Sequence, residues 1–259
     1  MSLIVDIFPC RSDNYGYLAH DTATGKTAAI DAPEAGPIQA AAKRRGWTIS
    51  DIFITHHHAD HTDGIRPLKS AFGATVTGPR AEAEKIPALD IAVNPGDVVT
   101  LGESAFFVLA TPGHTLGHIA YHDAAGGHLF SGDALFSLGC GRMFEGKPGP
   151  MWEGLSMLRG LSDVTLVYFG HEYTVSNAKF ALTIEPKNAA LRIRAAEAER
   201  MRAKGLPTVP VTLGMEKATN PFLRADRPDV AAALGLAGAK PESVFAALRK
   251  AKDNFKPPA

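Results

Sequence analysis

Short apolar stretches, many of them alternating or rich in β-branched residues, recur through the first two thirds of the chain and predict strands. Between them, amphipathic stretches predict helices at 37–45, where Gly46 is placed to cap the C-terminus, at 64–72 and at 151–161. The predicted strands are 3–8, 15–19, 27–30, 49–54, 74–77, 98–101, 106–109, 119–121, 128–130 and 165–169.

The pattern changes near residue 173. Beyond this point helical periodicity dominates, and the segment 188–204 is rich in Ala, Arg and Glu. The pattern therefore predicts two domains: 1–173, in which strands and helices are mixed, and 174–259, which is helical. The helices predicted in the second domain are 174–183, 188–204, 229–234 and 242–250.

Charge and cysteine content exclude several classes of protein. The chain has 27 basic and 27 acidic residues, so its net charge gives no support for a nucleic-acid or anionic-membrane partner. No apolar run approaches the ~20 residues that a membrane helix needs. The two cysteines, Cys10 and Cys140, do not form a disulfide framework, and the first residues lack a secretory signal. We therefore expect a cytoplasmic protein, and we expect it to be a monomer.

Four predicted strands each end in a small or turn-forming residue that is followed by a potential metal ligand. The strand at 49–54 leads into the segment 55–61, which reads Thr-His-His-His-Ala-Asp-His. The other three strands lead to His114, Asp133 and His171. If these strands share one edge of a core, their side chains converge there.

Two sets of ligands can be separated within the segment 55–61. On an extended chain His56 and His58 face the same way, so we expect them to bind one ion, whereas His57 points away. Asp60 and His61 lie beyond the strand end, within reach of a second ion.

The remaining donors complete a pair of sites. We expect His114 to join the first set and His171 the second, with Asp133 bridging the two ions through its two oxygens. Each ion then keeps a position for a shared water or hydroxide, which indicates a catalytic site. Nitrogen and oxygen donors without thiolate suit zinc, iron or manganese, and we expect two divalent ions with zinc as the first choice. The other histidines are expected to be structural, with His118 near His114: His20, His118, His122 and His128.

The His-x-His-x-Asp-His pattern, together with Gly113-His114, Gly132-Asp133 and Gly170-His171, resembles the metallo-β-lactamase superfamily. That resemblance implies an α+β fold, an αββα sandwich with a dinuclear site at one edge, followed here by a smaller all-helical domain. It leaves the reaction open, because the superfamily contains lactamases, thioesterases, nucleases and dioxygenases.

Other segments are similar to the glyoxalase II family, the hydroxyacylglutathione hydrolases. They are 139–146 (Gly-Cys-Gly-Arg-Met-Phe-Glu-Gly), 170–174, 220–224 (Asn-Pro-Phe-Leu-Arg) and 248–256. This resemblance implies hydrolysis of S-D-lactoylglutathione to D-lactate and glutathione by a metal-bridging hydroxide, with Asp60 and Asp133 as the catalytic carboxylates. It makes 1–173 a catalytic domain and 174–259 a substrate-binding domain.

The same resemblance implies contacts to the glutathione part of the substrate. Arg249 and Lys252 match a basic pair that holds a glutathione carboxylate, and at i and i+3 they share a helix face. Arg142 and Phe144 stand where the family often has lysine and tyrosine, and the missing hydroxyl removes a hydrogen bond of about 0.5–1.5 kcal/mol. The expected substrate-binding residues are Arg142, Met143, Phe144, Tyr173, Arg249 and Lys252.

Alternative functions follow from the same fold. A glutathione persulfide dioxygenase would use one iron held by two histidines and an aspartate, but the long helical segment with Arg249 and Lys252 favours the hydrolase. A broader thioesterase remains an alternative. A nuclease is disfavoured by the zero net charge, and a non-enzymatic metal-binding protein by the open coordination position.

Overall fold

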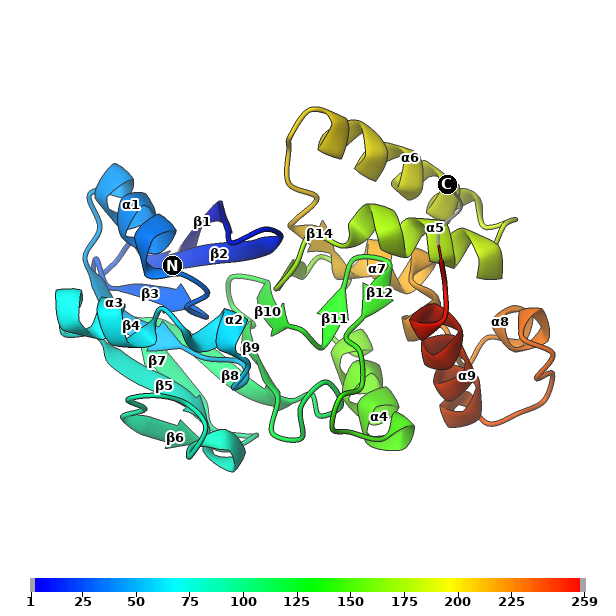
Figure 1. The fold of residues 1–259 in the computed structure, drawn as a ribbon, viewed down its shortest axis with the longest axis horizontal. Coiled ribbons are helices and arrows are strands. Elements are labelled where there is room, and N and C mark those ends of the chain that lie inside the picture. The colour runs from blue at the N-terminus through cyan, green and yellow to red at the C-terminus, as the bar shows by residue number, and fades with distance from the viewer. Residues whose placement is uncertain (1–2, 257–259) are drawn as a thin grey trace. The chain divides into compact units, whose positions relative to one another are not determined.

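The computed structural model describes residues 3–256, and its internal contacts divide the chain into two compact units (Figure 1). Unit 1 is Met1–Thr111 with Thr115–Gly132, and unit 2 is Pro112–His114 with Asp133–Ala259. The domain boundary at 173 stays a prediction. Within residues 3–256, every helix is too short or too polar to cross a bilayer.

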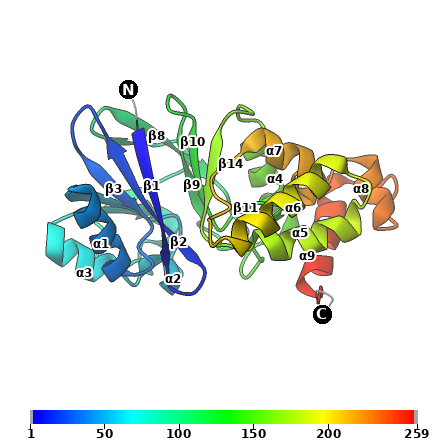
Figure 2. The same cartoon turned by 90° about the horizontal axis from the view of Figure 1, so that it is seen from above.

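Unit 1 contains a six-stranded mixed sheet that carries helices on its outer face. The first three strands are antiparallel, and the third to sixth are parallel. Helices α1 (Ala35–Arg45) and α3 (Ile65–Phe72) pack on this sheet (Figures 1 and 2), and Gly46 ends α1 in the left-handed conformation, as predicted. The strands are β1 (Leu3–Cys10), β2 (Asn14–Asp21), β3 (Thr27–Ile30), β4 (Ile49–Phe53), β5 (Thr75–Pro79) and β6 (Ile91–Val93).

A second, antiparallel group of strands faces the first sheet across an aromatic core. The ring centroid of Phe53 lies 5.6 Å from that of Phe106 and 5.4 Å from that of Tyr121. At the other side of the core, Tyr17 and Phe130 are 5.9 Å apart. Unit 1 is therefore a sandwich of two sheets, and strands such as β3 are buried along their whole length. The second group consists of β7 (Val98–Leu101), β8 (Ser104–Ala110), β9 (Ile119–Asp123) and β10 (His128–Gly132), and unit 1 also contains α2 (Ala59–Thr62) and η1 (Arg80–Glu82).

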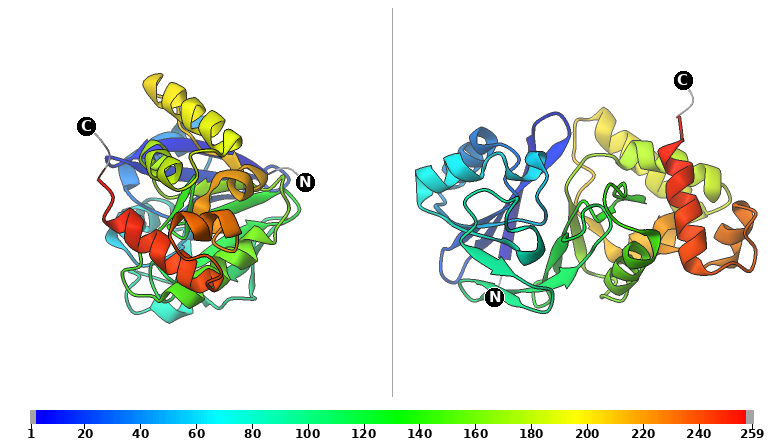
Figure 3. Two further views of the ribbon diagram at one scale, coloured as in Figure 1. Left: turned by 90° about the vertical axis from the view of Figure 1, so that its right-hand side faces the viewer. Right: turned by 60° about the horizontal axis from the view of Figure 1, so that its bottom comes forward.

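Unit 2 is mainly helical. Helices α5 (Thr174–Ile184) and α6 (Ala189–Ala203) pack through small and aliphatic residues around Leu138, Ala178 and Leu191. Helix α9 (Pro241–Asp253) packs on α4 (Pro148–Arg159) and η2 (Pro221–Leu223) (Figure 3). Its elements are β11 (Leu135–Phe136), β12 (Gly139–Cys140), α4 (Pro148–Arg159), β13 (Leu166–Phe169), α5 (Thr174–Ile184), α6 (Ala189–Ala203), β14 (Val211–Thr212), α7 (Leu213–Thr219), η2 (Pro221–Leu223), α8 (Pro228–Ala233) and α9 (Pro241–Asp253).

Several of these elements differ from the sequence-based expectation. Helix α4 begins at Pro148 rather than at 151, because proline fits the first turn of a helix, where its missing N–H has no partner to lose. The pattern missed α7, which begins where the hydroxyl of Thr212 accepts a hydrogen bond from Met215 N. Strands β11, β12 and β14 have two residues each, too few for a detectable alternation.

Candidate metal centre

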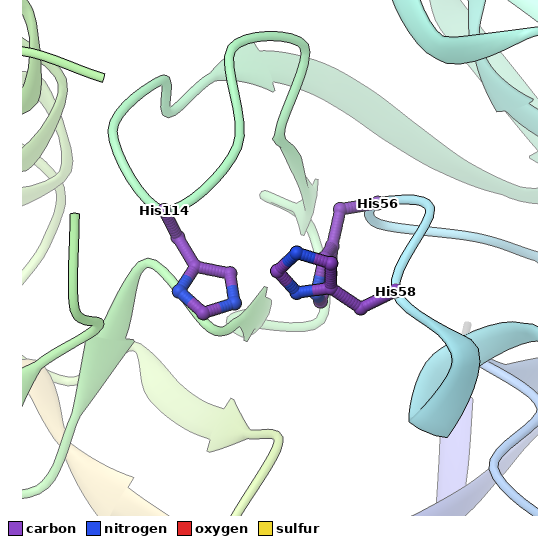
Figure 4. Close-up of side chains that lie close together, drawn as sticks. All are labelled: His56, His58 and His114. Carbon is purple, nitrogen blue, oxygen red and sulfur yellow. The ribbon is translucent and has the colours of Figure 1, made fainter. Parts of the chain in front are cut away.

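The loop that follows β4 carries His56 and His58. His56 Nε2 lies 3.1 Å from His58 Nδ1, and Figure 4 shows the two side chains on this loop. The other ring nitrogen of His56 lies 3.0 Å from the hydroxyl of Thr55. Two nitrogens bound at 2.0–2.1 Å to one tetrahedral ion are roughly 3.3 Å apart, so this spacing fits a shared ion.

Helix α2 carries the second pair of donors, Asp60 and His61. His61 is buried, and its Nε2 lies 3.6 Å from Asp60 Oδ2. The opposite ring nitrogen, Nδ1, lies 2.8 Å from Asp31 Oδ2, so a proton on Nδ1 leaves Nε2 available as a metal ligand. Asn14 Nδ2 donates to the carbonyl oxygen of Asp60 and to its Oδ2, at 3.1 and 3.2 Å. Asp60 and His61 are therefore held with their donor atoms facing each other.

Asp31 is a supporting residue that the sequence analysis did not select. Its buried carboxylate accepts hydrogen bonds from Thr55 N at 2.8 Å and from Thr55 Oγ1 at 2.9 Å, besides its contact with His61. Asp31 directly follows β3, the parallel neighbour of β4, so it lies at a strand end like His56. No small or turn-forming residue separates it from the strand, so the rule that selected His56 did not select Asp31.

Two other histidines of unit 1, His57 and His118, hold the loop after β4 in place and are not among the predicted metal ligands. The backbone N–H of His57 donates to Glu82 Oε2 at 2.7 Å, and its ring Nδ1 lies 2.8 Å from the same oxygen. His118 is buried, bonds the hydroxyl of Thr111 at 2.8 Å and packs against His56 with 4.8 Å between ring centroids. These contacts fix the position of His56 from its outer side.

Unit 2 brings together the three remaining predicted ligands. His114 follows Gly113 and is the third side chain in Figure 4. Asp133 Oδ2 lies 3.3 Å from His114 Nε2 and also 3.3 Å from His171 Nε2, and all three side chains are buried. The same carboxylate oxygen thus faces one histidine from each predicted set. The predicted bridge by Asp133 between two ions stays a prediction.

The outer faces of these two histidines are also occupied. His114 Nδ1 lies 2.9 Å from the carbonyl oxygen of Arg142, so the ring donates there and keeps Nε2 for a metal. The Phe144 ring meets His114 edge to face at 5.2 Å between centroids, and Tyr173 stacks on His171 at 4.9 Å. Phe144 is 60% exposed and Tyr173 37%, so both rings offer an open surface next to a metal ligand.

The expected substrate-binding cations have different surroundings. Arg249 is only 5% exposed and donates to the carbonyl oxygen of Cys140 at 2.8 Å. Lys252 donates to Ser176 O at 3.1 Å, and burial, followed by the nearby Arg249 charge, lowers its pKa to about 8. Arg142 is exposed, with its guanidinium 5.9 Å above the Phe144 ring. Met143, between them in sequence, is half-buried.

The donor chemistry indicates metal binding. Histidine nitrogens and carboxylate oxygens face one another, or a second histidine nitrogen, at 3.1–3.6 Å within each unit. The second ring nitrogens of His56, His61 and His114 each lie within 3.0 Å of a neighbouring oxygen. This second layer of hydrogen bonds is typical of protein metal sites, where it fixes the tautomer of the ligand.

Asp31 gives a direct test of that second layer. We expect Asp31→Asn to weaken metal binding by about tenfold, because the amide keeps the shape but loses the charge beside His61. Asparagine also tolerates the left-handed backbone found at this position, where φ is 55°. Competition with a chromophoric chelator measures the change. Wild-type affinity in this variant would contradict the role given to Asp31.

Family models and curated relatives assign the chain to the same family. A family model described as "Metallo-beta-lactamase superfamily" matches residues 21–171, and one described as "Hydroxyacylglutathione hydrolase C-terminus" matches residues 172–255. The chain is 52% identical over 255 residues to the hydroxyacylglutathione hydrolase of Ruegeria pomeroyi, covering 98% of this chain and 100% of that protein. It is 54% identical over 253 residues to the protein of the same name from Rhizobium etli, covering 98% and 99%.

Solved structures agree on the fold. ETHE1 from Myxococcus xanthus is 28% identical, with a TM-score of 0.67, and the match covers 100% of this chain and 92% of that one. The BLEG-1 B3 metallo-β-lactamase is 20% identical, with a TM-score of 0.66 and coverage of 85% and 99%. At that identity the likeness concerns the fold alone.

Proposed function

Since the chain belongs to the hydroxyacylglutathione hydrolase family of the metallo-β-lactamase superfamily, we propose that it hydrolyses S-D-lactoylglutathione and related 2-hydroxyacylglutathiones to the hydroxy acid and glutathione. The family expected from the sequence is confirmed. Curated relatives at 52–54% identity over nearly the whole chain are named hydroxyacylglutathione hydrolase, which favours the hydrolase over the alternative persulfide dioxygenase.

The proposed cofactors are two divalent metal ions, and zinc is the favoured metal. The observation that carries this proposal is Asp133 Oδ2, which lies 3.3 Å from the Nε2 atoms of both His114 and His171. This oxygen lies within reach of one histidine from each predicted set, as a ligand common to two ions would. The proposed ligands are His56, His58 and His114 for one ion, Asp60, His61 and His171 for the other, and Asp133 for both.

The residues around these donors have defined tasks in the proposed reaction. When bound, the metal ions supply hydroxide near neutral pH and polarise the thioester carbonyl. Asn14 and Asp31 hold Asp60 and His61 in orientation, while the Arg142 carbonyl holds His114. The leaving thiol has a pKa near ~8.5, so it departs as a thiolate without a dedicated acid.

Neither cysteine takes part in this reaction. Burial raises the pKa of Cys10 to about 12 and that of Cys140 to about 11, so both remain thiols at neutral pH. Both are free and buried, which supports the proposal of a cytoplasmic location. We also propose a monomer without a nucleic-acid partner, in keeping with the zero net charge, and a catalytic domain 1–173 followed by a substrate-binding domain 174–259.

The proposed glutathione contacts lie on exposed or half-buried side chains of unit 2, with Arg249 as the buried exception. Arg142 and Lys252 supply charge for the carboxylates of the tripeptide, and Phe144 and Tyr173 supply apolar surface beside the metal ligands. The full proposed set is Arg142, Met143, Phe144, Tyr173, Arg249 and Lys252.

The lowered pKa of Lys252 predicts a pH-dependent affinity. Below about pH 8 the side chain is protonated and can bind a carboxylate, and as the pH rises through that value the charge is lost. We expect KM to rise by about tenfold between pH 7 and pH 9.5 in the wild type, because a charge-assisted hydrogen bond disappears. In Lys252→Arg the guanidinium stays charged, so KM should stay nearly flat. Parallel pH profiles for the two proteins would exclude Lys252 as the titrating contact.

Metal analysis combined with a substrate panel tests the function. We expect about two metal ions per chain and the highest kcat/KM for S-D-lactoylglutathione, compared with other glutathione thioesters and one coenzyme A thioester. A single tightly bound iron, with oxygen consumption on glutathione persulfide and no thioester hydrolysis, would contradict the proposal. Equal rates on the coenzyme A thioester would instead indicate a broader thioesterase.

A further inference from the structure

We infer that Asn220 is a positioning residue for the proposed glutathione contacts, because it holds the hairpin of β11 and β12 on which the Tyr173 ring rests. The inference rests on the proposed function in that Tyr173 and Arg142 face the tripeptide. Asn220 opens the segment 220–224, to which the family resemblance assigns no task in the reaction. Every residue involved belongs to unit 2.

The amide of Asn220 spans the two strands of this hairpin at its neck. Phe136 and Gly139 lie opposite each other in the register of β11 and β12. Asn220 Nδ2 donates to the carbonyl oxygens of both, at 3.1 and 2.9 Å, and Asn220 Oδ1 accepts a hydrogen bond from Phe222 N at 3.0 Å. Asn220 is fully buried, so water cannot easily replace its amide, and loss of these bonds would release the neck of the hairpin.

The turn of the hairpin is held by the same buried polar cluster. Leu138 has a left-handed backbone with a φ of 58°, which is unfavourable for a leucine. Glu216, also fully buried, accepts hydrogen bonds from Ser137 Oγ at 2.7 Å and from Leu138 N at 2.8 Å. Its Oε2 lies 3.0 Å from Asn220 Nδ2, and Asn177 donates to Ser137 O at 3.1 Å. Backbone strain that buried groups hold in place is typical of segments whose position matters for function.

The first strand of the hairpin supports the aromatic surface of the site. The Phe136 ring meets the Tyr173 ring edge to face, with 5.4 Å between centroids, and lies 6.1 Å from the ring of His171. Phe136 is buried and Tyr173 is partly exposed, so Phe136 is the support and Tyr173 the surface offered to a ligand. Because Asn220 binds the carbonyl oxygen of Phe136, it determines where this support lies.

The second strand leads to the proposed cations. From β12 the chain continues into the loop 140–142, where the carbonyl oxygen of Cys140 accepts a hydrogen bond from Arg249 at 2.8 Å. Arg142 Nε lies 3.4 Å from Asp253 Oδ1. The loop thus links the hairpin to α9. One amide at the hairpin neck therefore fixes the start of both segments that carry proposed contacts to the tripeptide.

Two thioesters of the same acyl group separate this role from a general effect on the fold. S-D-lactoylglutathione carries the tripeptide, whereas S-D-lactoyl-N-acetylcysteamine lacks it. In Asn220→Ser the hydroxyl can still cap η2, but it is too short to reach both carbonyl oxygens of the neck. In the zinc-loaded variant we expect KM for the glutathione thioester to rise by about tenfold, and kcat/KM for the truncated thioester to stay within about twofold of wild type.

Asn188→Ser is the matched control. Asn188 also caps a helix, since its Oδ1 accepts a hydrogen bond from Leu191 N at 3.1 Å, but its Nδ2 donates to Ala218 O at 2.9 Å rather than to the hairpin. Both thioesters should keep their wild-type constants in this variant. Phe136→Leu is a second test, because it keeps the hairpin bonds and shortens the support under Tyr173, and it should raise KM for the glutathione thioester by about threefold or more.

Two results would overturn the inference. One is a folded Asn220→Ser protein with the wild-type KM for S-D-lactoylglutathione. The other is an equal loss of activity on both thioesters, which would mean that Asn220 supports only the fold or the metal centre. If Asn220→Ser yields no folded protein, Phe136→Leu decides: a raised KM for the glutathione thioester alone supports the inference, and a wild-type KM overturns it. The proposed function fails separately, if the wild type does not hydrolyse S-D-lactoylglutathione.

Discussion

Asp133→Ala is expected to lower kcat for thioester hydrolysis by about a thousandfold and to reduce the metal content from about two ions per chain to one or fewer. The carboxylate oxygen that faces both His114 and His171 is lost, so two cations would have to share the site without the anion between them. Loss of the paired ions removes roughly 4 kcal/mol of transition-state stabilisation. Metal analysis of the purified variant and initial rates on S-D-lactoylglutathione measure both effects.

A second buried aspartate serves as the control. Asp123 is buried like Asp133, and its Oδ2 lies 3.1 Å from Nδ1 of a histidine, His128, but the pair lies outside the proposed ligand set. Asp123→Ala should cost about 1–3 kcal/mol of stability while keeping both metal ions and most of the turnover. If Asp133→Ala also kept two metal ions and the full rate, the proposed bridge would be wrong.

Gly141→Ala is expected to lower turnover by more than a hundredfold and to destabilise the fold by about 1–3 kcal/mol. A Cβ on Gly141 would overlap the carbonyl oxygen of Asp133 and lie 3.2 Å from His114 Nδ1. The obstacle is backbone rather than a flexible side chain, so the loop must move, and His114 must move with it. Initial rates and thermal unfolding of the metal-free and zinc-loaded protein record the two effects separately.

Gly36 offers a matched glycine-to-alanine change in open space. It lies in α1, and a Cβ there meets nothing within 4 Å. Gly36→Ala should therefore preserve turnover and change stability by no more than ~1 kcal/mol, in the stabilising direction. Wild-type rates in Gly141→Ala would show that the loop can move without loss of turnover. They would contradict the prediction that close packing of this loop against His114 is needed for the reaction.

Much of the fold and the candidate centre could be predicted because strand ends carry a strong signal. A buried apolar run followed by a turn residue and a histidine or aspartate was enough to select His56, His114, Asp133 and His171. The same rule missed Asp31, because Asp31 follows Ile30 directly, with no turn residue between the apolar strand and the carboxylate. The parallel pairing of β3 with β4, which places Asp31 beside the metal loop, is not encoded in either strand alone.

The tail shows a different limit of sequence reasoning. Positions i and i+3 of one helix suggested a shared face for Arg249 and Lys252, and this holds for an isolated helix. That one residue is buried and the other half-buried depends on what packs against each, here the loop at Cys140 and the backbone of Ser176. Those partners are 109 and 76 residues away in sequence, so local periodicity carries no information about them.

The contact between α9 and the loop 140–142 restricts how this chain can be recombined with its relatives. Exchanging the C-terminal helices alone would separate Arg249 and Asp253 from the carbonyl oxygens and the Arg142 side chain that they hold. A chimera that transfers the loop and α9 together keeps both halves of the interaction. The two segments, about a hundred residues apart, thus form one unit of exchange, and substitutions in one constrain which residues the other can accept.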